Sequence, residues 1–162
     1  MTLSVAIQLH PIHSTDIDGD STFSLALEAQ ARGHSLFYYL PKNLSLNKGV
    51  VVARGQDLTV RREQGNHATL GEERQIDLSI MDVVLLRQDP PFDMGYITTT
   101  HILDRIHPDT LVVNDPTWVR NWPEKLKGLD YHDLTPPTAI ASNLDTLKAL
   151  KERHGDVSLK PL

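Results

Sequence analysis

A short turn between residues 86 and 93 carries the side chains best suited to chemistry. The stretch LRQDPPFD begins with the last residue of the apolar run VVLL and places Arg87, Asp89 and Asp93 around two consecutive prolines. Because each proline fixes its own φ, the turn has little conformational entropy to lose when a ligand binds. Arg87 could bind a carboxylate through two parallel hydrogen bonds, and Asp89 could accept from an ammonium or amide group. The alternative is that Arg87 and Asp89 pair with each other and only fix the turn.

The elements that must position this turn indicate an α/β fold with an open, mostly parallel sheet and flanking helices. Residues 3–9 and 35–41 are rich in β-forming side chains, and residues 21–34 between them have apolar positions at helical spacing. Strand, helix and strand in this order form a βαβ unit, whose two strands are predicted to be parallel. Residues 82–87 predict a fully buried strand that leads directly into the turn.

The middle of the chain has a different character. Residues 44–63 hold short β-prone pieces separated by turn signals at residues 47–49 and 54–57, which favour a small antiparallel meander. Residues 63–75 have no apolar period and predict a mobile loop.

The α/β pattern then returns with a helix over residues 94–106 and a buried strand over residues 110–115. The predicted buried face of the helix consists of Ile97, His101, Ile102 and Ile106. In an open parallel sheet, ligands bind beyond the carboxyl ends of the strands. The polar residues at the predicted strand ends are His10, Arg87, Asp89, Asn114 and Asp115. We therefore expect these side chains to converge on one edge of the sheet.

The composition changes near residues 133–138, DLTPPT, where two adjacent prolines predict a linker. Residues 138–142 then predict a strand, residues 143–155 a helix, and residues 156–162 the start of another strand. The predicted buried stripe of the helix consists of Leu144, Leu147 and Leu150. A strand-helix-strand piece of this size cannot bury its own apolar face, so we expect this unit to be incomplete.

Composition limits the class of protein. The chain has 162 residues, of which 40% are hydrophobic and 23% charged, enough for a domain with a real core. A net charge of -5 argues against a nucleic-acid partner. No apolar run approaches the roughly 20 residues that span a bilayer, and the N-terminus lacks the basic segment of a signal peptide. The absence of cysteine excludes disulfides and thiol chemistry. A cytoplasmic protein is the simplest interpretation.

The segment HPIHSTDIDGD, residues 10–20, is rich in possible metal ligands. They are His10, His13, Asp16, Asp18 and Asp20. A calcium loop needs Gly at its sixth position and Glu at its twelfth, whereas Gly19 is fourth counted from Asp16 and Leu27 is twelfth. We therefore predict a solvated loop that ends in a helix cap at Asp20 or Ser21, and no metal site.

Two lysines and two tryptophans carry weaker signals. Lys125 is isolated in the sequence, and taken alone it is expected to be an ordinary solvent-exposed lysine. Lys160 follows VSL in an apparently buried strand, where an ammonium group needs an anionic partner. Trp118 and Trp122 lie four residues apart and favour a role in the core or in an interface.

Several stretches taken together resemble one family. They are DSTFSLALEAQARGH, LLRQDPPFD, VVNDP, EKL, DLTPPT and LKPL, in this order along almost the whole chain. In this combination the chain resembles the bacterial glutathione synthetases, which are members of the ATP-grasp superfamily. The first strand departs from the family, because His10-Pro11 stands where Asp-Pro is usual, and no role tied to that acid is carried over.

The resemblance implies a pre-ATP-grasp domain over residues 1–122 and the beginning of an ATP-grasp domain over residues 123–162. Lys125 and Lys160 match two lysines that contact ATP, which would give Lys160 its anionic partner. Arg87, Asp89 and Ser21 are expected to contact the substrate, and no catalytic residue is assigned.

The reaction that the resemblance implies joins γ-glutamylcysteine to glycine. ATP phosphorylates the dipeptide carboxylate, and the glycine amine then displaces phosphate to give glutathione. Mg²⁺ bridges the phosphates, and its ligands are expected beyond residue 162. We accordingly expect the chain to be the N-terminal half of a tetrameric enzyme and to have no ligase activity alone, because groups that neutralise developing phosphoryl charge are missing.

Two alternatives remain open at this stage. One is another ATP-grasp ligase that joins a carboxylate to an amine, such as a D-alanine–D-alanine ligase or an amino-acid ligase, because a fold alone does not settle the substrate. The other is a stand-alone α/β binding domain without catalysis.

Overall fold

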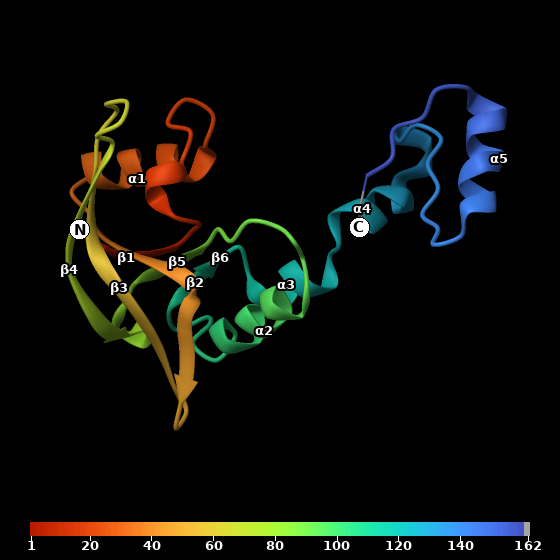
Figure 1. Ribbon diagram of the computed structural model, residues 1–162. Helices are drawn as coiled ribbons and strands as arrows, with labels where there is room; N and C mark the ends of the chain where they lie inside the picture. Colours follow the sequence, from red (N-terminus) through yellow and green to blue (C-terminus); the bar gives the residue numbers. More distant parts are fainter. Residues whose placement is uncertain (161–162) are drawn as a thin grey trace. The chain divides into compact units, whose positions relative to one another are not determined.

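A six-stranded sheet forms the centre of the first part of the chain (Figure 1). The computed structural model describes residues 1–160, which fall into two compact units, Met1–Arg120 and a second that begins at Asn121. The strand order is β4-β3-β2-β1-β5-β6; β2, β1, β5 and β6 run parallel, whereas β3 and β4 are antiparallel to their neighbours. This confirms the predicted mostly parallel sheet with a meander at one edge. The strands are β1 Ser4–Gln8, β2 Ser35–Asn47, β3 Val50–Val60, β4 Ala68–Asp77, β5 Val83–Leu86 and β6 Leu111–Val113.

The strand order reverses at β1. From β1 the chain passes through helix α1, Ser21–Ala31, to β2 on one side, and β5 later pairs with the other side of β1. Both pairings are parallel, as the apolar runs predicted. The carboxyl ends of β1 and β5 therefore lie next to each other at the point where open α/β sheets bind ligands.

Alternate residues of β1 serve two hydrophobic cores on opposite faces of the sheet. Val5 and Ile7 belong to a core that includes Phe23 of α1, while Ala6 belongs to a core that includes Leu103 of α2, Met94–Leu103. Phe23 and Leu103 have no exposed surface. Because each core is anchored by one helix, the sheet holds α1 and α2 in fixed positions relative to the ends of β1 and β5.

The predicted loop over residues 63–75 is wrong for most of its length, because residues 68–77 form strand β4. Of the ten residues in this strand only Ile76 is buried. An edge strand with polar side chains on both faces has no apolar period, so its sequence resembles a loop.

The first turn of the meander is confirmed and the second is wrong. Lys48 and Gly49 connect β2 to β3 with φ angles of 49° and 87°, as a tight hairpin turn requires. Residues 54–57, predicted as a turn, lie inside β3, where Gly55 pairs with Tyr39 and Arg74.

Helix α2 and strand β6 occur where the sequence predicted them, but their predicted burial is only partly correct. Helix α2 ends at Leu103 instead of residue 106 and buries Thr99, Thr100 and Leu103. Ile106 is buried as predicted, whereas His101 is exposed and Ile97 and Ile102 are only half-buried. Strand β6 buries Val112 alone, because it lies at the sheet edge. Among residues 1–160 no helix combines the length and the apolar character needed to cross a membrane.

The second unit is helical in the part that the structure describes. After Pro123 come α4, Glu124–Lys127, and a 3-10 helix over Gly128–Leu134, whereas α3, Pro116–Asn121, lies almost wholly in the first unit. Helix α5, Leu144–His154, begins as predicted at Asn143, whose side chain accepts from Thr146 N at 2.9 Å.

The strands predicted on either side of α5 are wrong within the described residues. Residues 138–142 and 156–160 form no strand, and Pro161 and Leu162 lie outside the described residues. A strand needs a neighbour to satisfy its backbone groups, and residues 121–160 contain none. The predicted stripe on α5 is not buried either, since Leu144 is 61% exposed and Leu147 and Leu150 are half-buried.

Gly55 is required by a close approach between strands. A Cβ atom at this position would lie 2.2 Å from Tyr38 O and 2.9 Å from ring carbons of Phe37. We expect Gly55→Ala to lower the free energy of unfolding by about 2 kcal/mol, because the backbone must shift. Gly71→Ala is the control, since its Cβ would meet Asp57 at an ordinary 3.4 Å. Urea unfolding measures both variants, and equal effects would contradict this explanation.

Asp104 and Arg120 form an ion pair at 2.7 Å that ties the end of α2 to α3. The hydrogen bond from Arg120 lowers the pKa of Asp104, against the opposing effect of burial. A carboxyl group with a lowered pKa stabilises the fold above its unfolded pKa of about 3.9 and loses this effect as pH falls through the folded value. We expect Asp104→Asn to lower the free energy of unfolding by about 1 kcal/mol at pH 7.

The difference between wild type and Asp104→Asn should shrink progressively as the pH falls below about 4, because the wild-type carboxylate is then itself protonated. Chemical unfolding at several pH values measures this, with Asp109→Asn, at an exposed position, as the control. A difference that is constant with pH would show that the ion pair is not its source.

Candidate functional site

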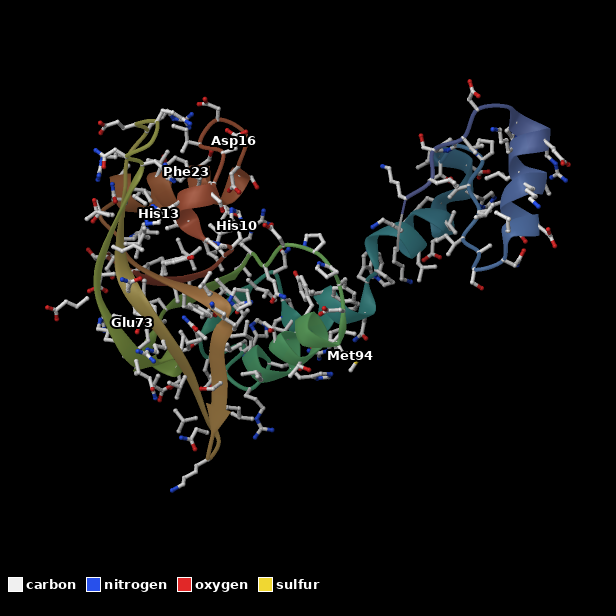
Figure 2. All side chains as sticks on the ribbon, viewed as in Figure 1. His10, His13, Asp16, Phe23, Glu73 and Met94 are labelled. Carbon is white, nitrogen blue, oxygen red and sulfur yellow. The ribbon has the colours of Figure 1, made fainter. Side chains whose placement is uncertain are left out.

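Side chains from three segments meet at the carboxyl ends of β1 and β5. The segments are the loop after β1, the first turn of α1 and the proline turn after β5. Figure 2 shows His10 in the loop that leads from β1 towards α1. The prediction that His10, Arg87 and Asp89 converge is confirmed by the contacts described below.

Arg87 is held by the first turn of α1. Its Nε donates to Thr22 Oγ1 and its Nη2 to Ser21 Oγ, both at 2.9 Å. The turn is fixed by Asp20, which caps the helix by accepting from Phe23 N at 2.7 Å, as the sequence predicted. Among the described side chains no carboxylate lies within ion-pair distance of Arg87, so this half-buried cation has hydroxyl partners only.

Asp89 contacts His10 and not Arg87. Its Oδ2 atom lies 2.7 Å from His10 Nδ1, and His10 Nε2 lies 3.1 Å from Thr15 Oγ1. The alternative that Arg87 and Asp89 merely pair with each other is therefore wrong. The side chain of Asp89 is 60% exposed, so most of its carboxylate faces solvent.

Tyr38 fixes the loop that carries His10. Its hydroxyl donates to His10 O at 2.9 Å and accepts from Ile12 N at 3.2 Å. Burial raises the pKa of Tyr38, and the hydrogen bond from Ile12 lowers it by less. The neutral phenol can therefore donate and accept at the same time, which holds both residues of the loop.

Tyr96 of α2 lies next to the proline turn. Burial raises the pKa of its phenol, while the charge of Arg87 lowers it and the charge of Asp89 raises it. Its ring centroid lies 4.9 Å from that of Phe92 in the proline turn. The proline turn therefore packs against the start of α2.

Asn114 and Asp115 follow β6, as predicted, but the contacts of Asp115 are local. Its Oδ1 accepts from Thr117 N at 2.9 Å at the start of α3, and its Oδ2 lies 3.5 Å from His107 Nε2. Asn114 is exposed. Asp115 therefore serves the helix, and no contact joins it to Arg87.

The segment of residues 10–20 uses its acids within the loop and on its neighbours. Asp16 Oδ1 accepts from Asp18 N at 3.1 Å, and Asp18 lies 3.3 Å from Arg62. Figure 2 shows His13 and Asp16 near α1. In residues 1–160 no group of three or more His, Asp or Glu side chains is placed to hold a metal ion.

Lys125 and Lys160 line one hollow of about 940 Å³ in the second unit. The hollow is also lined by apolar side chains, among them Ile140, Leu147 and Leu150. Lys160 is exposed and lies outside any strand, so the prediction of a buried lysine is wrong. Two cations on one partly apolar hollow can bind a ligand that has both phosphate groups and a flat apolar part.

Trp118 and Trp122 are 58% and 49% exposed, so the alternative that they lie in the core is wrong. The Nζ atom of Lys127 lies 4.7 Å from the ring centroid of Trp122. A role of these residues in an interface stays a prediction.

Sequence reasoning missed several residues of the cluster, namely Gln8, Thr15, Thr22, Tyr38, Gln88 and Tyr96. Gln8 is fully buried at the end of β1 and donates to Gln88 Oε1 at 3.0 Å. A buried polar residue inside an apolar strand was the one signal that could have identified it. Thr22 stands beside Ser21 in a helix start, and nothing in its spacing points to Arg87.

Comparison with known proteins decides the family. The sequence model for the prokaryotic glutathione synthetase N-terminal domain matches residues 3–120. The chain belongs to this family. Its whole length is 56% identical to a glutathione synthetase of Rhodopseudomonas palustris and 57% identical to one of Bradyrhizobium diazoefficiens, and it covers 52% of each. A glutathione synthetase of Vibrio vulnificus is 38% identical, with 51% covered. The chain thus spans about half the length of these curated relatives of the glutathione synthetase family.

Removal of the Thr22 hydroxyl should release Arg87. Thr22→Val keeps the side-chain shape but cannot accept from Nε, and we expect hydrogen exchange of the Arg87 Nε–H group to become about tenfold faster. Thr22→Ser restores an acceptor and should keep exchange slow. NMR of the arginine side chains measures this; equal exchange in the two variants would argue against the hydrogen bond.

Proposed function

We propose that this chain forms the N-terminal portion of a glutathione synthetase. The enzyme joins γ-glutamylcysteine to glycine with ATP and gives glutathione, ADP and phosphate. The observation that carries the proposal is the match of residues 3–120 to the N-terminal domain of the family, together with similarity over the full chain to proteins named glutathione synthetase. In this proposal residues 1–122 are a pre-ATP-grasp domain and residues 123–162 begin an ATP-grasp domain.

The cluster at the ends of β1 and β5 is proposed to bind the dipeptide through Arg87, Asp89 and Ser21. A cation and an acid that are held on a stiff turn, each with a fixed position, suit a small ligand with several charges. The arrangement of Arg87 between two hydroxyl groups leaves its charge available to a carboxylate.

Lys125 and Lys160 are proposed to contact the phosphates of ATP. Both are exposed and line one hollow, which supports a shared ligand of high negative charge. The described acids do not form a set of ligands for Mg²⁺. A cytoplasmic location and a tetrameric assembly stay predictions.

A chimera tests the proposed reaction. Residues 1–162 replace the corresponding half of the Rhodopseudomonas palustris relative, to which they are 56% identical. We expect the chimera to form glutathione from γ-glutamylcysteine, glycine and ATP within about tenfold of the parent rate, a change of about 1.4 kcal/mol in the barrier. We expect the chain by itself to form none, because it spans about half the length of the relatives.

Two lysine variants of the chimera test the ATP site. Lys125→Met and Lys160→Met should raise the KM for ATP, whereas Lys148→Met, at an exposed position of α5, should not. A folded chimera that releases phosphate with D-alanine or another amino acid, but makes no glutathione, would instead identify a different carboxylate–amine ligase. A chimera that folds without any ligase product would contradict the proposal.

A further inference from the structure

The cluster at the ends of β1 and β5 holds two opposite charges that do not neutralise each other. Arg87 is hydrogen-bonded to Ser21 and Thr22, and Asp89 lies against His10. The two side chains are two positions apart on a turn that contains Pro90 and Pro91. Their separation is therefore built into the fold and does not depend on a ligand.

Arg87 has N–H donors that its contacts with Ser21 and Thr22 do not use. The hydrogen bonds to Ser21 and Thr22 use two of its five N–H groups, and the other three have no acid partner among the described side chains. A half-buried guanidinium without a counter-charge is unfavourable, and a bound carboxylate removes that cost. The first turn of α1, which supplies both hydroxyls, also favours negative charge at this position.

Asp89 has an oxygen to spare. Its Oδ2 lies 2.7 Å from His10 Nδ1, and this contact engages one of the two carboxylate oxygens. The side chain is 60% exposed, so the other oxygen can accept a hydrogen bond from a ligand. An ammonium group is the natural donor to such an exposed and oriented carboxylate.

Arg87 and Asp89 stand two positions apart on one turn, and both contact the segment that leads from β1 into α1, Arg87 at Ser21 and Thr22 and Asp89 at His10. A cation and an anion held near each other in this way are complementary to a zwitterion. In γ-glutamylcysteine, the glutamyl α-carbon carries a carboxylate and an ammonium group, whereas the cysteine end carries a carboxylate and a thiol. The glutamyl head is the part of the dipeptide that matches both charges.

We propose that the cluster binds the free α-amino-acid head of the glutamyl residue, with its α-carboxylate at Arg87 and its α-ammonium at Asp89. This inference rests on the proposed function. It leaves the cysteine carboxylate free to react with ATP. Glycine is also a zwitterion, but its amine is the nucleophile, and an amine held as ammonium by Asp89 cannot attack.

Two substrate analogues separate the two contacts. Glutarylcysteine lacks only the α-ammonium group, and 4-aminobutyrylcysteine lacks only the α-carboxylate. In the chimera with the relative's second half, we expect kcat/KM to fall at least about tenfold for each analogue. Asp89→Asn should abolish the preference for γ-glutamylcysteine over glutarylcysteine. It should keep the preference for γ-glutamylcysteine over 4-aminobutyrylcysteine. Arg87→Gln should show the reverse pattern.

Asp93 provides the matched control. It stands in the same turn, but its carboxylate accepts from Tyr96 N at 2.9 Å and caps α2, a role that asparagine also fills. Asp93→Asn should leave both preferences unchanged. Each preference is the ratio of the kcat/KM values of two substrates in the same variant. A general loss of order in the turn therefore leaves this ratio unchanged.

A direct binding measurement uses the chain itself. Titration with γ-glutamylcysteine should shift the NMR signal of Arg87 Nε–H, and titration with 4-aminobutyrylcysteine should not.

If both compounds shift this signal equally, or if Asp89→Asn in an active chimera keeps the preference for γ-glutamylcysteine over glutarylcysteine, the inference is wrong while the proposed function stands. A rise in the KM for glycine alone, in Asp89→Asn, would place glycine at the cluster and also overturn it. A chimera that makes no glutathione contradicts the proposed function instead, and the NMR titration then decides the inference.

Discussion

The parallel pairing of β1 with β5 is the constraint on which the candidate site depends. A further hydrogen bond joins Arg87 N to Gln8 O at 3.1 Å, so the residue that directly follows β5 is also the first residue of the site on the proline turn. Strand β1 also pairs in parallel with β2 on its other side. The loop that leads into α1 starts at the carboxyl end of β1 and therefore at the same edge of the sheet. The two buried cores then fix α1 and α2 around this point, and the proline turn spans the distance between them.

Much of this framework could be predicted from the sequence, because it depends on local patterns. Apolar runs identified β1 and β5, and a capping residue identified the start of α1. The prediction failed where neighbours decide the structure. Strand β4 has the composition of a loop and is a strand only because β3 pairs with it, and residues 138–142 have the composition of a strand but lack a partner in the described second unit.

The site could be predicted in its location and not in its contacts. The rule that ligands bind at strand ends placed His10, Arg87 and Asp89 at one edge, and this was correct. Their partners are far away in sequence: Thr22 and Ser21 lie 65 and 66 positions from Arg87. No periodicity or spacing links residues at such separations. The partners of Arg87 and Asp89 are therefore decided by the packing of α1 and of the loop before it.

Two arginines of the first unit differ in whether a carboxylate compensates their charge, and this difference bears on function. Arg120 has a structural role, and it is paired with Asp104, whose pKa the contact lowers. Arg87 is fixed as firmly, but by hydroxyl groups that leave its charge uncompensated, although Asp89 stands two positions away and is directed to His10 instead. An ion pair between these two neighbours would compensate both charges, as the pair of Asp104 and Arg120 does. Their separation is a local violation of charge pairing, and such violations occur where a protein keeps a group available for a ligand.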